Sequence, residues 1–297
     1  DSRCSCTGAR WTVHDAVGKE KTGGRQVSGH KQAQQRLSLI TTETSPMSRN
    51  LQSKDDVIAT LEEYIQDNET AGSPLGYFPA LYLKVTKQVK KGIAEGFFEK
   101  GHRMERLDVI FASRYIDAYD AYQRQEPITQ SWDKAFLMAQ DYWPIVLQHL
   151  LIGMNAHINL DLGIAAATVM KGEPIDDLHT DFNRINQILS LLVGEVQDEL
   201  ATIWPTLHWI LRKTGQIDDK LVDFSMEIAR DGAWRFAKDL ALASKEHWPQ
   251  MIALRDQEVA QLAKSISYPG WIINLALKFI RLGERGTVAE KIAVLNT

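Results

Sequence analysis

The chain has 297 residues, 24% of them charged, and a formal net charge of −4 at pH 7. A chain of this length can bury a large hydrophobic core, and its acidic balance argues against a nucleic-acid-binding surface. Both cysteines, Cys4 and Cys6, precede the region that we predict to be folded. That region therefore has no disulfide, thiolate zinc site or cysteine nucleophile, which is typical of a cytoplasmic protein.

Residues 1–46 differ in composition from the rest of the chain. They are rich in Gly, Ser, Thr, Lys and Arg, lack helical periodicity, and contain seven Lys and Arg against four Asp and Glu. This composition predicts a disordered leader, and the lack of an apolar stretch argues against a secretory signal. Because Met47 opens a self-contained domain, one hypothesis is that the leader is not native. The folded domain is expected to span residues 47–297, with a net charge of −7.

Proline, glycine and capping residues divide this domain into a succession of predicted helices. Ser53 with Asp56 is expected to cap the first helix, and Ser131 the fourth. The first expected helix ends at about Asn68. The next three are Tyr77–Glu95, His102–Gln123 and Trp132–Tyr142, and a long central helix follows them. The expected helices after the central one are Asp177–Ile203, Thr206–Lys213, Asp218–Glu246, Pro249–Ser267 and Pro269–Leu282. No alternating pattern typical of a β-strand follows Met47. The predicted fold is therefore all-α, a single-domain multi-helix bundle.

The central helix is the most informative element of the sequence. Its apolar background is interrupted by six hydrogen-bonding side chains: Gln148, His149, Asn155, His157, Asn159 and Asp161. The stretch from Tyr142 to Leu160 has no charged side chain, which suits a membrane span, but polar groups are costly in lipid without partners. We therefore predict a helix at about Pro144–Lys171 buried in the middle of a bundle, with no transmembrane segment.

Helical spacing sorts these polar residues into faces. His157 and Asp161 are four residues apart, so their side chains can share a metal ion or a proton. Gln148, Asn155 and Asn159 fall on another face. The alternative to a functional site is a set of core polar groups that bond to backbone and to one another.

The segment that follows the central helix, Asp176–Asn186, carries further candidate ligands. A short turn at Gly172–Pro174 makes the next helix an antiparallel neighbour, which would bring Asp177 and His179 toward the central helix. The expected metal ligands are His157, Asp161 and His179. This mixed N/O set suits zinc, iron or manganese, with magnesium as a further candidate. Ordinary helix capping is the competing explanation for the aspartates at this helix start.

Two other segments have alternative interpretations. Arg114 either pairs with Asp117 on a helix surface or faces the pocket to hold an anionic group, with Tyr115 as a donor. The candidate catalytic residues are Asp177, Asn159, Arg114 and Tyr115. The basic and apolar segment Trp271–Leu282 either touches a membrane surface or, as we prefer, docks on the bundle.

Several sequence blocks resemble one known family. They are MERLDVIFASRYIDAY, a helix that begins with Trp, QHLLIGMNAHINLDLGIA and DFNRIN. Together they are similar to an uncharacterised bacterial family catalogued as domain of unknown function 5995, over nearly all of Met47–Asn296. The resemblance implies a single domain and draws attention to His157, Asn159 and Asp161. It implies no particular activity.

The sequence leaves two main classes of function open. The first is a metal-dependent enzyme that acts on a small, partly apolar substrate in a pocket lined by the HINLDL and DDLHTDFNRIN segments, with Asp177 as a ligand or base. The second is a non-catalytic binding or interaction module whose polar core is structural. A lesser alternative is an isoprenoid-diphosphate enzyme, because Asp176, Asp177 and Asp181 loosely match an aspartate motif that binds magnesium diphosphate. The oligomeric state and the substrate are not indicated.

Overall fold

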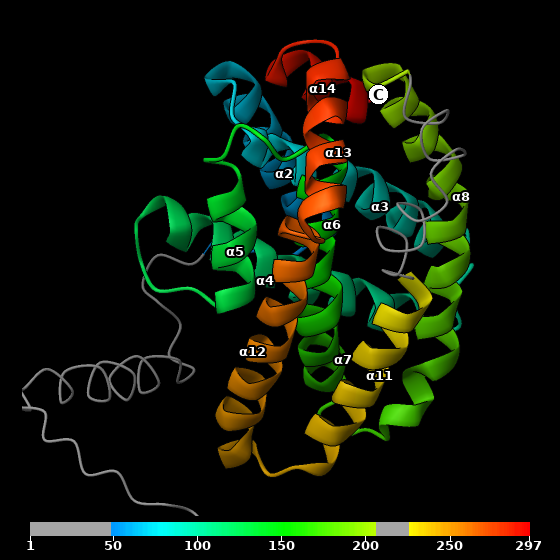
Figure 1. Ribbon diagram of the computed structural model, residues 1–297. Coiled ribbons are helices and arrows are strands. Elements are labelled where there is room, and N and C mark those ends of the chain that lie inside the picture. Colours follow the sequence, from blue (N-terminus) through cyan, green and yellow to red (C-terminus); the bar gives the residue numbers. More distant parts are fainter. Residues whose placement is uncertain (1–48, 206–225) are drawn as a thin grey trace, which may run out of the picture. The chain divides into compact units, whose positions relative to one another are not determined.

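Helices account for the regular structure of the computed structural model, which describes residues 49–205 and 226–297 (Figure 1). These described residues contain no β-strand, and the predicted all-α class is confirmed for them. They all belong to one compact unit, Thr42–Thr297. The predicted leader 1–46, the predicted helix Thr206–Lys213 and residues 218–225 lie outside the described residues.

Most helices begin and end close to the proline, glycine and capping residues that were expected to bound them. The helices before the central one are α2 (Lys54–Ala71), η1 (Pro74–Gly76), α3 (Tyr77–Ala94), α4 (Gly101–Gln123) and α5 (Gln130–Met138). The central helix comprises α6 (Val146–Ala156), η2 (His157–Leu162) and α7 (Gly163–Val169). It is followed by η3 (Ile175–Leu178), α8 (His179–Ile203), α11 (Met226–Leu242), η4 (Lys245–His247), α12 (Trp248–Ser267), α13 (Trp271–Gly283) and α14 (Val288–Leu295). The helix α14 was not predicted, although Thr287 and Glu290 form a capping box at its start.

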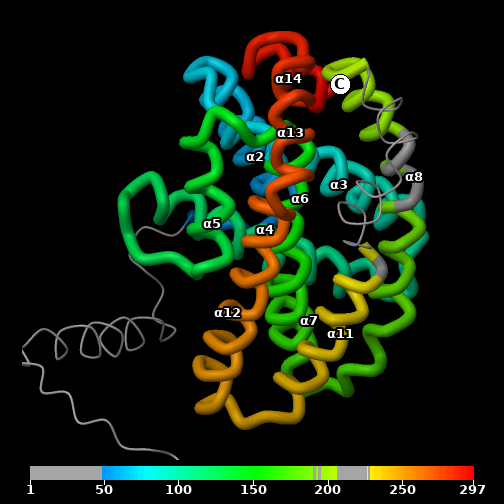
Figure 2. The backbone as a smooth tube through the Cα atoms, in the orientation of Figure 1, coloured from blue at the N-terminus to red at the C-terminus, as the bar shows by residue number. Residues whose placement is uncertain are grey.

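The central helix runs through the interior of the bundle, as predicted (Figure 2). Its α6 part packs against α3, α5 and α12, whereas η2 and α7 pack against α4 and α11. By length and composition Val146–Val169 could cross a membrane, yet 94% of its most apolar window is buried inside the fold. Core burial therefore explains its composition.

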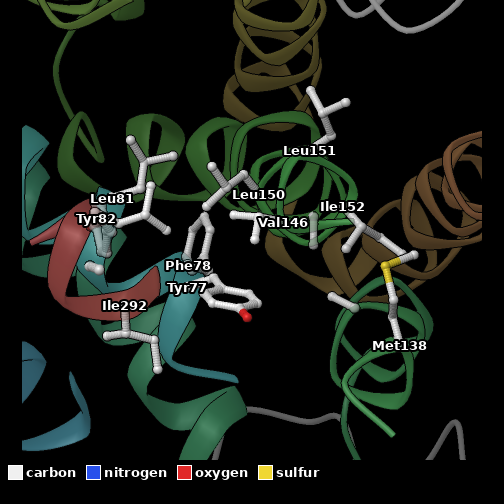
Figure 3. Packing of buried hydrophobic residues seen from close by; sticks show 14 of the residues in the cluster. Tyr77, Phe78, Leu81, Tyr82, Met138, Val146, Leu150, Leu151, Ile152 and Ile292 are labelled. Atoms are coloured by element: carbon white, nitrogen blue, oxygen red, sulfur yellow. The ribbon is translucent and has the colours of Figure 1, made fainter. Parts of the chain in front are cut away.

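Aromatic and aliphatic side chains fill the space between α3 and the central helix. Tyr77 and Phe78 of α3 lie beside Val146 and Leu150 of α6 in the main hydrophobic cluster (Figure 3). The two helices approach closely at Gly153, because the Phe78 ring occupies the space that a Cβ atom at this position would need.

Buried carboxylates from distant parts of the chain cap three helices. Asp256 of α12 accepts hydrogen bonds from the backbone N–H groups of Gln130 and Ser131 at 2.7 and 2.9 Å, at the start of α5. Asp181 does the same for the start of α4, and Glu284 accepts from the first N–H of α6. The predicted cap by Ser131 is wrong, because a carboxylate from another helix satisfies these N–H groups and complements the helix dipole.

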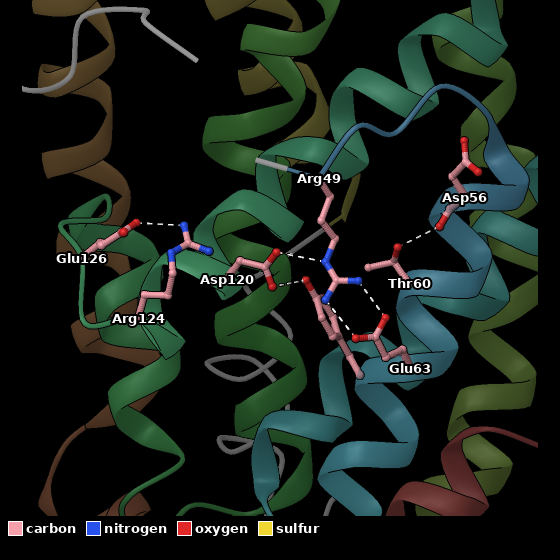
Figure 4. Close-up of polar contacts among 8 residues, drawn as sticks. Arg49, Asp56, Thr60, Glu63, Asp120, Arg124 and Glu126 are labelled. Atoms are coloured by element: carbon pink, nitrogen blue, oxygen red, sulfur yellow. Dashed lines mark hydrogen bonds and ion pairs between the residues drawn. The ribbon is translucent and has the colours of Figure 1, made fainter. Parts of the chain in front are cut away.

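An ion-pair cluster fixes the segment before α2. Arg49 Nε donates to Asp120 of α4 at 3.0 Å, while its two terminal nitrogens donate to Glu63 of α2 at 2.7 and 2.9 Å (Figure 4). The Tyr64 hydroxyl donates to the same Asp120 at 2.6 Å. These contacts tie the first described residues to α2 and α4.

Candidate functional site

Asp161 is the centre of the buried polar group that the central helix carries. Its side chain is fully buried. Oδ1 accepts a hydrogen bond from Arg114 Nε of α4 at 3.0 Å, and Oδ2 accepts one from Trp132 Nε1 of α5 at 2.8 Å. His157 Nδ1 lies 3.3 Å from the same Oδ2, so the structure brings the predicted i, i+4 pair together. A buried carboxylate needs several such partners because removing it from water costs several kcal/mol.

The backbone at this point is a π-helix. It covers His157–Leu162, and all six of its side chains are buried. Single π-helical turns inside α-helices are rare and occur often at functional sites. The sequence did not predict this change of helix type, although the HINLDL block coincides with it.

The protonation states of His157 and Asp161 follow from their surroundings. Burial raises the pKa of the Asp161 carboxyl, but Arg114, His157 and Trp132 together outweigh it and lower this pKa below its ordinary value. Burial lowers the pKa of His157 and outweighs the opposite effect of Asp161. The pair at neutral pH is therefore a carboxylate and a neutral imidazole. Because Nδ1 faces the carboxylate, it carries the proton and Nε2 is left as an acceptor.

His157 Nε2 is buried and has no hydrogen-bond partner among the described residues. The imidazole stacks on Phe111 with 3.6 Å between ring centroids, and Tyr82 lies edge-on at 4.6 Å. Three further rings surround it at 5.8 to 6.2 Å: Phe78, Tyr115 and Trp132. The Tyr115 hydroxyl is likewise buried without a partner among the described residues. Such atoms are exceptional in folded proteins and call for an explanation.

A small cavity adjoins this enclosure. It has a volume of about 20 Å³, which is enough for one water molecule. Its lining includes Phe78, Tyr115 and Trp132, the three rings that also contact His157. Half-buried Pro74 and Leu75 line it as well, and so does the buried His149, whereas His157 does not line it. The cavity therefore lies between the rings around His157 and the surface at η1.

The other polar face of the central helix bonds to α12. Gln148 Nε2 donates to Ile266 O at 2.9 Å, and Asn155 Nδ2 donates to Val259 O at 3.0 Å. Asn159 Nδ2 donates to Asn155 Oδ1 at 3.1 Å. The contacts step by seven residues along each helix in opposite directions, as antiparallel neighbours require. This amide ladder places Asn159, a predicted catalytic residue, in a structural contact.

His179 and Asp177 have other neighbours than His157 has. His179 is exposed, with its ring 4.8 Å from that of Trp234, and Asp177 is exposed with its carbonyl bonded to Arg103. Among the described residues no three His, Cys, Asp or Glu side chains are grouped so that they could hold one ion. The predicted three-ligand grouping is therefore not formed. The hairpin joins His179 to the end of α7, whereas His157 lies roughly 18 Å further back along the helix axis.

The aspartate motif considered for magnesium diphosphate does not converge either. Asp176 pairs with Lys238 at 2.9 Å on the surface. Asp181 is buried and accepts from the backbone N–H groups of Glu99 and Lys100. Helix capping therefore explains Asp181, and the motif gives no shared cation site in the described part of the chain.

Of the two partners of Asp161 on other helices, the sequence analysis predicted Arg114 as a site residue but not Trp132. Arg114 does face the buried site, as one of its two predicted alternatives states, although the anion it holds is the protein's own carboxylate. Trp132 was missed. The only available signal was that a buried indole N–H requires an acceptor, which does not reveal which acceptor it finds.

Comparisons with known proteins identify a family for this chain but no individual relative. Neither the curated proteins nor the solved structures include a match to this chain. A family of unknown function, DUF5995, matches residues 54–269, which is well over half of the chain. This stretch contains α2 to α12 and every residue of the His157 and Asp161 site. The chain therefore belongs to this family of unknown function, DUF5995.

Proposed function

We propose that the protein binds a small, partly apolar molecule that donates a hydrogen bond to His157 Nε2. One observation carries the proposal: this buried nitrogen has no partner in the described part of the chain, although the rest of the ring is held by Asp161 and Phe111. A ligand hydroxyl or N–H group would satisfy the nitrogen. The surrounding rings would supply the apolar contact that small-molecule sites usually have.

The adjoining cavity gives the ligand a route. Phe78 lines the cavity and also contacts His157, so its side chain stands between the two. A molecule larger than water requires Phe78 or a neighbouring ring to move, which is a common side-chain response to binding. The ligand would then lie between η1, α3 and α5, with its donor group directed at η2.

A second candidate function is acid–base catalysis by the same pair. It is favoured by the way Asp161 orients Nδ1, since a carboxylate that fixes the tautomer of a histidine is the arrangement of a general base. The same Nε2 is also the atom that a divalent ion would use. The described residues offer such an ion no group of three ligands, so an organic hydrogen-bond donor suits this environment better.

Phenol is a suitable probe, because it combines an aromatic ring with one strong donor. We expect saturable binding of phenol to the full chain, with a change in the NMR signal of His157 Nε2. His157→Phe keeps an aromatic ring of similar size but removes the acceptor, and should weaken phenol binding about tenfold, the equivalent of one neutral hydrogen bond. Toluene is the matched control ligand and should bind both proteins equally.

Two outcomes would contradict the binding proposal. One is the absence of saturable phenol binding to the parent protein. The other is phenol binding of unchanged affinity in His157→Phe. The catalytic candidate is tested separately with 4-nitrophenyl acetate: its hydrolysis should fall in both His157→Phe and Asp161→Asn but not in His179→Phe, and equal rates in all four proteins would rule against it.

A further inference from the structure

The helix α13 is apolar on two sides. Its inner side docks on the bundle through Ile273, Leu277 and Ile280, which are buried. Its outer side carries five large apolar residues that are 51% to 70% exposed: Trp271, Ile272, Leu275, Phe279 and Leu282. The docking that we preferred from the sequence therefore uses one side of the helix and leaves the other open to solvent.

Neighbouring aromatic residues extend this exposed surface. Tyr142 and Trp143, between α5 and α6, lie against α13, with Arg281 over the Tyr142 ring at 4.9 Å and Lys278 over the Trp143 ring at 5.1 Å. We define the outer face of α13 as Tyr142, Trp143, Tyr268, Trp271, Ile272, Leu275, Phe279 and Leu282. It contains eight of the thirteen large apolar residues that are exposed in the described part of the chain. Exposed apolar surface gathered in this way marks an interaction site.

The charges beside this face are mostly positive, although the exposed carboxylate of Asp141 lies next to Tyr142 in the sequence. The α13 sequence contains Lys278 and Arg281 and no acidic residue, and exposed Arg285 follows it. Glu284, the nearest carboxylate in sequence, is buried and bonded to Lys291 at 2.8 Å and Arg281 at 2.9 Å. The surface offered to a partner is therefore apolar, aromatic and basic, although the whole chain is net acidic.

We propose that the outer face of α13 docks on an anionic lipid surface, with the helix lying in the plane of the interface. The apolar side chains would enter the headgroup and acyl boundary, Trp and Tyr would sit at headgroup level, and the cations would meet lipid phosphates and carboxylates. A second copy of the chain fits less well, because a two-fold interface would bring together two surfaces that each carry more cations than carboxylates. This proposal does not depend on the His157 site.

Vesicle binding tests the proposal directly. The full chain should co-sediment with phosphatidylcholine vesicles that contain phosphatidylserine, and less with pure phosphatidylcholine, with binding that weakens in salt. The double substitution Ile272→Ser and Phe279→Ser should reduce binding at least tenfold. Lys278→Glu should reduce binding to the anionic vesicles more than about fivefold and leave binding to neutral vesicles unchanged.

A matched control removes exposed apolar side chains elsewhere. Leu242 and Leu254 are exposed at the end of α11 and in the first half of α12, away from α13 (Figure 1). The double variant Leu242→Ser and Leu254→Ser should bind vesicles like the parent. Thermal unfolding followed by circular dichroism checks that all variants are folded.

Several results would overturn the lipid assignment. The parent protein could fail to bind anionic vesicles, or the folded Ile272→Ser and Phe279→Ser variant could bind them as well as the control does. A concentration-dependent dimer in light scattering that this variant abolishes would assign the face to a second copy instead.

Discussion

The buried polar side chains on the two faces of the central helix find their hydrogen-bond partners in different ways. On the α12 side, Gln148 and Asn155 bond to backbone carbonyls of the neighbouring helix. On the α4 and α5 side, Asp161 contacts three side chains, and His157 is left with one buried nitrogen that has no partner in residues 49–205 and 226–297. The first face is complete in itself and fixes how two helices align. The second is complete around Asp161 but not around His157, so we place the candidate function there.

The cost of burial explains why the two faces differ. A neutral amide gains about 1 kcal/mol from a hydrogen bond, and one or two bonds satisfy it. A buried carboxylate requires a cation and further donors, because its desolvation costs several kcal/mol. Amides therefore suit a repeated ladder, whereas a carboxylate concentrates partners at one point and can orient a neighbouring imidazole.

Asp161→Ala should have the largest effect on stability. It leaves Arg114, Trp132 and His157 without their common acceptor, and we expect a loss of about 3–5 kcal/mol in the free energy of unfolding. Urea denaturation measures the loss. A loss below about 1 kcal/mol would show that Asp161 is not the centre of this face.

The sequence predicted the central helix and the His157–Asp161 pair because both depend on local spacing. Helix periodicity and caps such as Ser53 are local too, and they placed most helix boundaries within a few residues. Apart from the capping box of α14, the missed contacts discussed above join distant segments. Trp132 meets Asp161 across 29 residues, and Asp256 caps α5 across more than 120. His179 was misplaced because a hairpin was assumed to align it with His157, whereas helix length separates them.

A second buried carboxylate, Asp108 of α4, differs from Asp161. Its Oδ2 has no partner among the residues that the structure describes, and burial raises its pKa to about 7. Since this pKa is raised above the unfolded value, the contribution of Asp108 to stability is present below about pH 4 and is lost as the pH rises to about 7. Asp161, with a lowered pKa, has the opposite dependence and loses its contribution as the pH falls.

Asp108→Asn should therefore stabilise the protein at about pH 8, by about 1–3 kcal/mol relative to its effect at about pH 4. Urea unfolding of both proteins at the two pH values provides the comparison. An identical difference at both would mean that Asp108 does not carry the shifted proton.

Asn155→Leu tests the amide ladder. The substitution keeps the volume but removes the bonds to Val259 O and Asn159, so we expect a loss of about 1–2 kcal/mol. Ile152→Leu, a change at a buried apolar position on the same helix, is the control and should cost less. If both substitutions cost the same, packing rather than hydrogen bonding holds α12.

His157→Phe should have the smallest effect. The variant loses one long hydrogen bond to Asp161 but no longer buries an unpaired acceptor, and it retains the stacking on Phe111. We expect the free energy of unfolding to change by less than about 1 kcal/mol. A loss of more than about 3 kcal/mol would identify His157 as a structural group like Asp161.

The protonation of His157 is the most direct test of the proposed binding site. Long-range proton–nitrogen NMR of the full chain, assigned by comparison with His157→Phe, distinguishes the two ring nitrogens and both tautomers. We expect a neutral ring at neutral pH, with the proton on Nδ1 and the lone pair on Nε2, that stays neutral below the ordinary histidine pKa of about 6.5. A proton on Nε2, or a charged ring at neutral pH, would leave no acceptor for a ligand and would contradict the site.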